Sequence, residues 1–116
     1  MEIIEELSDD VRVIGLRGRL DANTTPAVER RIRALLDQGE TRLVFDLSEL
    51  AYISSLALRV LIVVAKHMQK INGRLALAAL NDHIYEIFKI AGFTSIFSIY
   101  PTREEAIAST AAFRRS

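Results

Sequence analysis

The feature that most constrains this chain is a short apolar run followed, after a turn, by a long helical pattern. Residues 43–45 are Leu-Val-Phe and end at Asp46, which is typical of a central parallel strand covered on both faces. Residues 55–71 then carry apolar side chains at helical spacing. A serine at the start of a helix is a favoured N-cap, because its hydroxyl accepts a backbone N–H of the first turn. The stretch therefore predicts a strand–turn–helix unit with serine hydroxyls at the beginning of the helix, where the helix dipole favours a phosphate.

The rest of the chain alternates between strand and helix patterns. Residues 3–7 and 11–17 read as a hairpin joined by Ser8-Asp9-Asp10. Further strands are expected at residues 42–46, 74–78 and 96–99, and helices that end near residues 38, 71, 91 and 112. This order predicts a single α/β domain over residues 1–116, with a mixed sheet of four or five strands and four helices mainly on one face. We expect the centre of its core to be formed by Val44, Phe45, Leu58, Leu61 and Ile62, and residues 113–116 to fray.

Composition excludes several classes of function. Fifteen basic and fifteen acidic residues cancel, so the chain lacks the basic footprint of a protein that binds nucleic acid directly. There is no cysteine, and His67 and His83 are too isolated to indicate zinc. The first residues do not resemble a signal peptide, and the apolar run of residues 50–65 is too short and too interrupted for membrane insertion. We expect a cytoplasmic protein without a cofactor.

Signatures of catalysis are also missing from the sequence. It contains neither a Gly-rich phosphate loop nor a G-x-S-x-G elbow. A triad of Ser55, His83 and Asp46 could be drawn, but almost any chain of this composition allows such a drawing. We therefore expect that the chain is not an enzyme. Considered alone, Ser55 is interpreted as a structural cap at the start of its helix.

Residues 46–58 support a more specific interpretation. They read Asp-Leu-Ser-Glu-Leu-Ala-Tyr-Ile-Ser-Ser-Leu-Ala-Leu, and this segment resembles the anti-sigma factor antagonist family of STAS domains. In that family a strand ends in an acid, and an aromatic–aliphatic pair, an acid or serine, and the phosphorylated serine follow. The segments at residues 18–21, 72–75 and 91–93 match further landmarks of the family, so the resemblance covers nearly the whole chain.

The resemblance implies a switch with two partners. An unphosphorylated member binds a serine-kinase anti-sigma factor, which uses its own ATP to phosphorylate the antagonist, and a PP2C-type phosphatase restores the binding form. Ser55 aligns with the phosphoacceptor. The implied partner-binding residues are Asp21, Asn23, Thr24, Ser54, Ser55, Leu56 and Arg59. A phosphate adds about −1.5 to −2 charges, which would repel a partner from a surface that already carries Asp21 and Asp46.

Two alternatives remain open at this point. One is a scaffolding or regulatory STAS subunit of a transporter or signalling complex, in which Ser55 only caps the helix. Leu56 favours it slightly, because the family usually has a small residue beside the phosphoacceptor. The other is an unrelated small enzyme, which the missing signatures disfavour. The sequence leaves open the oligomeric state, the kinase, the phosphatase and the sigma factor.

Overall fold

The sheet begins with the expected hairpin. In the computed structural model, which describes residues 1–111, β1 (Glu2–Ser8) pairs antiparallel with β2 (Val11–Leu20). Asp9 takes a positive φ of 55° in the turn between them, a conformation that short polar side chains tolerate. The expectations for residue 112 and for the tail of residues 113–116 lie outside the described residues.

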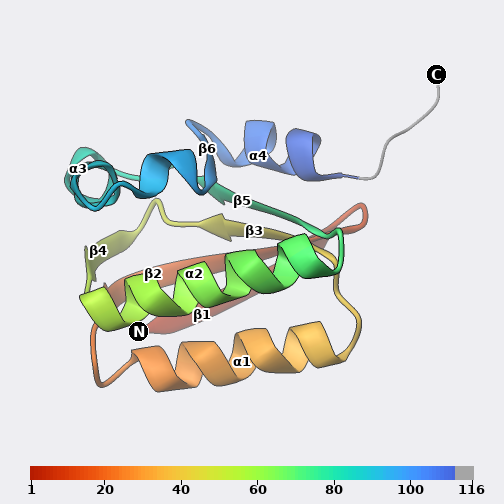
Figure 1. Cartoon of the computed structure of the whole chain (residues 1–116), viewed down its shortest axis with the longest axis horizontal. Helices are drawn as coiled ribbons and strands as arrows, with labels where there is room; N and C mark the ends of the chain where they lie inside the picture. Colours follow the sequence, from red (N-terminus) through yellow and green to blue (C-terminus); the bar gives the residue numbers. More distant parts are fainter. Residues whose placement is uncertain (112–116) are drawn as a thin grey trace.

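The remaining main strands run parallel to β2. β3 (Arg42–Asp46), β5 (Arg74–Ala78) and β6 (Ser98–Tyr100) complete the order β1-β2-β3-β5-β6 (Figure 1). β3 therefore lies at the centre, as the continuous run of residues 43–45 predicted. Leu43, Val44 and Phe45 are fully buried, because both faces of this strand are covered.

A sixth strand exceeds the expected four or five. β4 (Leu50–Ile53) pairs in parallel with the last residues of β2, beyond the segment of β2 that pairs with β3. The register shifts at Gly18, where φ is +114°, a value that glycine adopts without strain. The sequence predicted only a turn and a connection to the helix between residues 46 and 55, because a four-residue strand offers too little alternation to be recognised.

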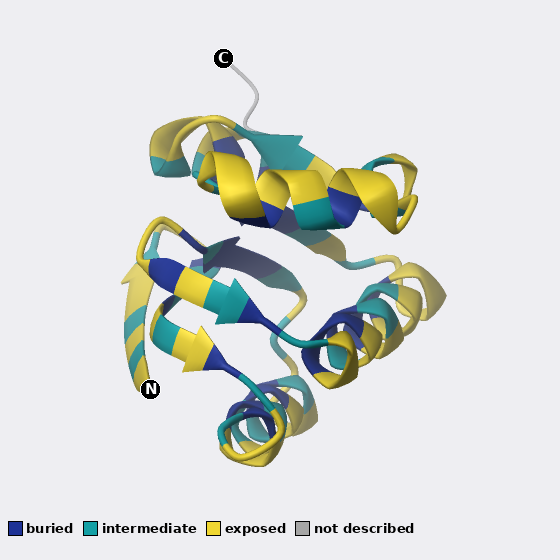
Figure 2. Cartoon of the chain, turned by 90° about the vertical axis from the view of Figure 1, so that its left-hand side faces the viewer, coloured by how far each residue is buried: buried dark blue, intermediate teal, exposed yellow. Residues whose placement is uncertain are grey.

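Three helices cover one face of the sheet. α1 (Thr25–Asp37), α2 (Ser55–Lys70) and α3 (Asp82–Ile90) turn their buried sides to the strands (Figure 2). A short 3₁₀ turn, η1 (Phe93–Ser95), follows α3. No helix within residues 1–111 is long and apolar enough to cross a membrane.

The last helix covers the opposite face. α4 (Arg103–Thr110) buries Ala106 against a smaller cluster that contains Val11, Val13 and Val44. The α/β class, the mixed sheet and the helices mainly on one face are thus confirmed. Two residues of the expected core centre are placed differently, because Val44 faces α4 and Ile62 is only partly buried.

Candidate functional site

The carboxyl ends of β2 and β4 hold two of the predicted segments side by side. Leu20 pairs with Ile53, and the N–H of Ser54 donates to the carbonyl of Leu20 at 2.9 Å. The loop that follows β2 is therefore fixed next to the beginning of α2. This contact brings Asp21 and its neighbours to the same rim as the two serines.

Ser54 caps α2. Its backbone is extended, with φ −90° and ψ 166°, and its Oγ accepts the N–H of Ala57 at 3.2 Å. Its carbonyl accepts the N–H of Leu58 at 3.0 Å. The expectation that Ser55 would be the cap is wrong. The hydrogen bond to Leu20 keeps Ser54 in extended geometry, and Ser55 is already the first residue of the helix.

Ser55 is the first residue of α2 and is exposed. Within residues 1–111, its hydroxyl has no hydrogen-bond partner. The two adjacent serines therefore differ: the Ser54 hydroxyl is used by the helix, whereas the Ser55 hydroxyl is accessible to a reagent from outside the chain.

The loop after β2 holds one carboxylate in a defined position. Asp21 Oδ1 accepts the N–H of Asn23 at 2.9 Å and that of Thr24 at 3.1 Å. Thr24 Oγ1 in turn accepts the N–H of Asp21 and donates to the carbonyl of Arg19. The hydrogen bond from the N–H of Thr24, partly opposed by desolvation and supported by the N–H of Asn23, lowers the pKa of Asp21, so this side chain is anionic at neutral pH. Asn23 is exposed on the loop.

An arginine that the sequence reasoning did not single out lies beside this loop. Arg19 stacks on Tyr52, with the guanidinium carbon 4.3 Å from the ring centre, and its Nε is 4.0 Å from Asp21 Oδ2. Arg19 and Tyr52 are opposite each other in the β2–β4 pairing. The pair could have been found only with β4 recognised as a strand.

The first two turns of α2 separate exposed from buried residues. Leu56 is 39% exposed and Arg59 is exposed, whereas Ala57 and Leu58 belong to the main core. Arg59 forms no ion pair with another described residue. The predicted residues Ser55, Leu56 and Arg59 therefore lie together on the outer side of the helix start.

Asp46 is not part of this rim. Its side chain lies on the α4 face, where Oδ2 is 3.5 Å from Arg103 Nη1 and Oδ1 accepts the N–H of Ser48 at 3.0 Å. The expectation that it would share a surface with Asp21 is wrong, because alternation along β3 directs Phe45 to one face and Asp46 to the other.

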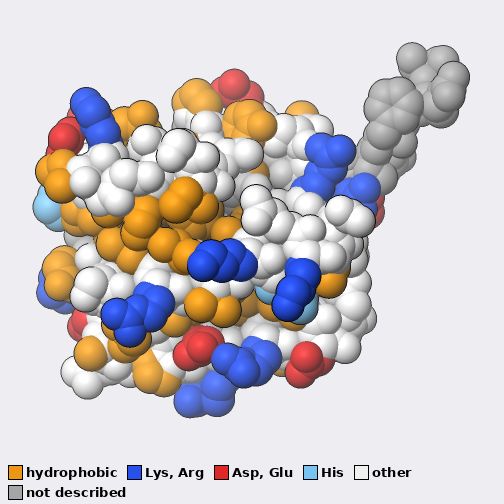
Figure 3. Space-filling model, in the orientation of Figure 1, with side chains coloured by type: hydrophobic (Ala, Val, Ile, Leu, Met, Phe, Trp, Pro, Cys, Tyr) orange, Lys and Arg blue, Asp and Glu red, His pale blue; other side chains and the backbone are white. Residues whose placement is uncertain are grey.

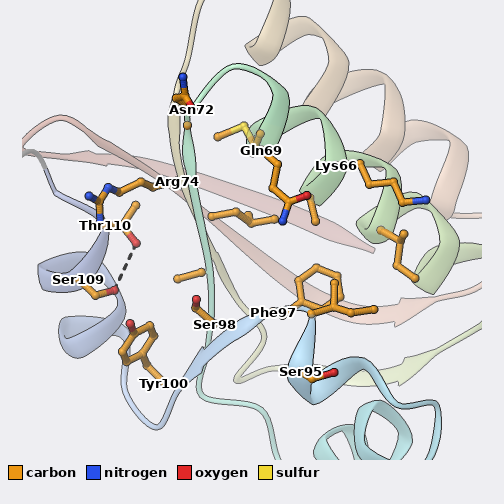
Figure 4. A pocket seen from close by; sticks show the side chains of 17 residues that line it. Lys66, Gln69, Asn72, Arg74, Ser95, Phe97, Ser98, Tyr100, Ser109 and Thr110 are labelled. Carbon is orange, nitrogen blue, oxygen red and sulfur yellow. Dashed lines mark hydrogen bonds between the residues drawn. The ribbon is translucent and has the colours of Figure 1, made fainter.

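A hollow in the described part of the chain lies away from this rim. It has a volume of about 800 Å³ and lies between the second half of α2, β5, β6 and α4 (Figure 4). Gln69, Arg74 and Tyr100 are among its lining residues, and none of the predicted site residues is. The candidate site is therefore an exposed rim and not a cavity.

Comparisons with known proteins identify the family of this chain. Residues 2–106 match the model of the STAS domain family. BtrV of Bordetella bronchiseptica, whose name assigns it to the anti-sigma factor antagonists, is 38% identical over 109 residues, which are 94% of each chain.

Two solved structures have the same fold. An anti-sigma factor antagonist of Mycobacterium paratuberculosis has a TM-score of 0.86 and 27% identity, with 94% of this chain and 92% of that chain covered. A Thermotoga maritima protein assigned by name to the same group has a TM-score of 0.89 and 21% identity, with 93% of each chain covered. The chain belongs to the anti-sigma factor antagonist family of STAS domains.

Proposed function

We propose that this chain is a phosphorylation-switched antagonist that binds a serine-kinase anti-sigma factor while Ser55 is unphosphorylated. Binding occupies the anti-sigma factor and thereby frees the sigma factor that it held. The observation that carries the proposal is the division of roles between the two serines. Because Ser54 caps α2 at 3.2 Å, the exposed Ser55 can be modified without loss of the cap.

The proposed docking surface consists of the loop after β2 and the outer side of the start of α2. Its residues are Asp21, Asn23, Thr24, Ser54, Ser55, Leu56 and Arg59. Leu56 offers apolar area, and Asp21 and Arg59 offer one charge of each sign. The hydrogen bonds within the loop hold Asp21 in one geometry, which lowers the entropy cost of binding.

Phosphorylation would release the partner without unfolding this chain. A phosphate on Ser55 lies at the positive end of the α2 dipole, which favours it within the antagonist. In the interface the same group adds about −1.5 to −2 charges beside Asp21 and must be desolvated, so it disfavours binding. ATP and its metal ion belong to the kinase, and a PP2C-type phosphatase would restore the binding form.

The test uses the purified serine-kinase anti-sigma factors of the same genome, each incubated with this chain, ATP and magnesium. Peptide-level mass spectrometry should map one phosphate to Ser55 in the wild type and in Ser54→Ala, and none in Ser55→Ala. Calorimetry with the same kinase should show that Ser55→Ala binds like the wild type and that Ser55→Glu binds more weakly.

Two results would contradict the switch. One is a phosphate that maps to Ser54, and the other is Ser55→Glu binding as tightly as the wild type. If no kinase of the genome modifies the chain, the proposal is replaced by the alternative of a STAS scaffold or regulatory subunit. The bulk of Leu56, 39% exposed beside Ser55, is the feature that favours this alternative.

A further inference from the structure

Arg59 lies one helical turn after Ser55, and the described structure gives it no ion-pair partner. We infer that Arg59 binds the phosphate of phosphorylated Ser55 within the same chain, so that it is a partner-binding residue in one state and a phosphate ligand in the other. This inference rests on the proposed function, since it concerns the phosphorylated form.

The spacing of the two residues on α2 brings them together. Side chains four residues apart on a helix are neighbours, with about 5–6 Å between their Cβ atoms. An anion that precedes a cation at this spacing is the favourable orientation, because it also agrees with the helix dipole. A guanidinium donates two parallel hydrogen bonds to phosphate oxygens. The Ser55–Arg59 pair meets these requirements, since both residues are exposed.

The other arginines near the rim already have partners. Arg19 stacks on Tyr52 and is 4.0 Å from Asp21. Arg17, two residues before Arg19 on β2, donates to Glu2 at 3.0 Å and to Glu49 at 2.8 Å. Moving either arginine to a new phosphate would break these contacts. Arg59 can turn to the phosphate at no such cost.

The charges around Ser55 also favour a phosphate that points toward Arg59. The anionic Asp21 on the loop repels a phosphate, and the loop N–H groups of Asn23 and Thr24 are already bound to Asp21. α2 itself contains no Asp or Glu in residues 55–70. Figure 3 shows Lys and Arg side chains along this helix, above the mixed charges of α1. A phosphate on Ser55 therefore has a repulsive neighbour on the loop and an attractive one on the helix.

The consequence is that one modification changes the docking surface twice. The phosphate adds negative charge, and the same event neutralises Arg59 as a contact for the kinase. Phosphorylation then removes an attractive charge from the interface as well as adding a repulsive one. Together, the two effects make the affinities of the unphosphorylated and phosphorylated forms for the kinase differ more than either effect would alone.

The experiment places phosphoserine at position 55 during translation, so that no kinase is needed, and follows the phosphate of the full chain by ³¹P NMR. A nearby cation stabilises the dianion and lowers the pH at which it forms. Arg59→Gln should therefore raise the midpoint of the ³¹P titration by roughly 0.2–0.4 pH units, the equivalent of an i,i+4 ion pair. Arg59→Lys should restore part of this difference, because it keeps the charge but not the planar fork.

Lys66→Gln is the matched control. It removes one positive charge from the same helix, but Lys66 lies 11 residues after Ser55, about 16 Å along the axis. This distance is about twice the screening length of 8 Å at physiological salt. The midpoint of the ³¹P titration of Lys66→Gln should therefore equal that of the wild type.

The inference is overturned if Arg59→Gln leaves the midpoint unchanged, or if Lys66→Gln raises it as much. Circular dichroism of each variant verifies that the fold is retained. A kinase that fails to modify Ser55 would defeat the proposed function but would not alter this titration, so the two failures are distinguishable.

Discussion

Ser54 and Ser55 are adjacent and identical, but they have different roles at the start of α2. Ser54 remains in strand geometry through its hydrogen bond to Leu20, and its hydroxyl is used by Ala57. Ser55 begins the helix and faces outward. The sequence predicted a hydroxyl at the helix start but assigned the cap to Ser55, whereas the structure assigns it to Ser54. That choice depends on the pairing of Ser54 with a residue 34 positions earlier, which no local pattern reveals.

The cap leads to a prediction about stability. Ser54→Ala should lower the free energy of unfolding by about 1 kcal/mol, because the N–H of Ala57 loses its acceptor. Ser55→Ala, an exposed change, should stay within about 0.5 kcal/mol of the wild type. Urea denaturation of both variants measures the difference. Equal losses for the two variants would show that the cap is not confined to Ser54.

α2 is the element that the sequence predicted best, because its apolar side chains repeat at helical spacing. Leu58 and Leu61 belong to the main core, as expected. β4 could not be predicted in the same way, since it has four residues and pairs in parallel with the distant end of β2. The sequence and the family resemblance placed Asp21, Ser54 and Ser55 on one partner-binding surface. The contact that joins the two segments, from the N–H of Ser54 to the carbonyl of Leu20, depends on the β2–β4 pairing and was not predicted.

The two faces of α2 should respond differently to truncation. Leu61 is 2% exposed and Leu56 is 39% exposed. Leu61→Ala should cost about 2–5 kcal/mol of unfolding free energy, because it leaves a cavity in the core. Leu56→Ala should cost clearly less and should instead weaken binding to the kinase. Denaturation and calorimetry on both variants provide the comparison, and a larger stability loss for Leu56 would mean that the helix faces are assigned wrongly.

At the scale of the whole molecule, ion pairs between glutamate and arginine connect the edge strand β1 to three other elements. Glu2 pairs with Arg17 of β2, Glu5 with Arg31 of α1, and Glu6 with Arg103 of α4. Arg103 also lies 3.5 Å from Asp46, so it connects α4 to the central strand. These pairs join residues up to 97 positions apart in the sequence, so no local pattern could indicate them. Most are exposed, and such pairs contribute little individually.

The Glu5–Arg31 pair is the one expected to make the stability of the molecule depend on pH. Arg31 donates two hydrogen bonds to the Glu5 carboxylate, one of them at 2.8 Å from Nη2 to Oε1, and only 20% of the Glu5 side chain is exposed. The hydrogen bond from Arg31, partly opposed by burial, lowers the pKa of Glu5 below its ordinary value. A carboxyl whose pKa is lower in the folded state stabilises the fold above its unfolded pKa, near 4.3, and loses that contribution as the pH falls through the folded value.

Glu5→Gln should therefore be less stable than the wild type at pH 7, and the difference between the two proteins should shrink as the pH falls below the unfolded pKa of a glutamate and through the lower folded pKa of Glu5. Glu86→Gln on α3 is the matched control, because Glu86 is exposed and forms no ion pair with another described residue. It removes one carboxylate from the surface without removing an ion pair, so it measures how much of the change comes from the loss of charge alone. Urea denaturation at pH 7, 5, 4 and 3 measures the three proteins. A gap between wild type and Glu5→Gln that stays constant from pH 7 to pH 3 would show that this ion pair does not connect β1 to α1 in solution.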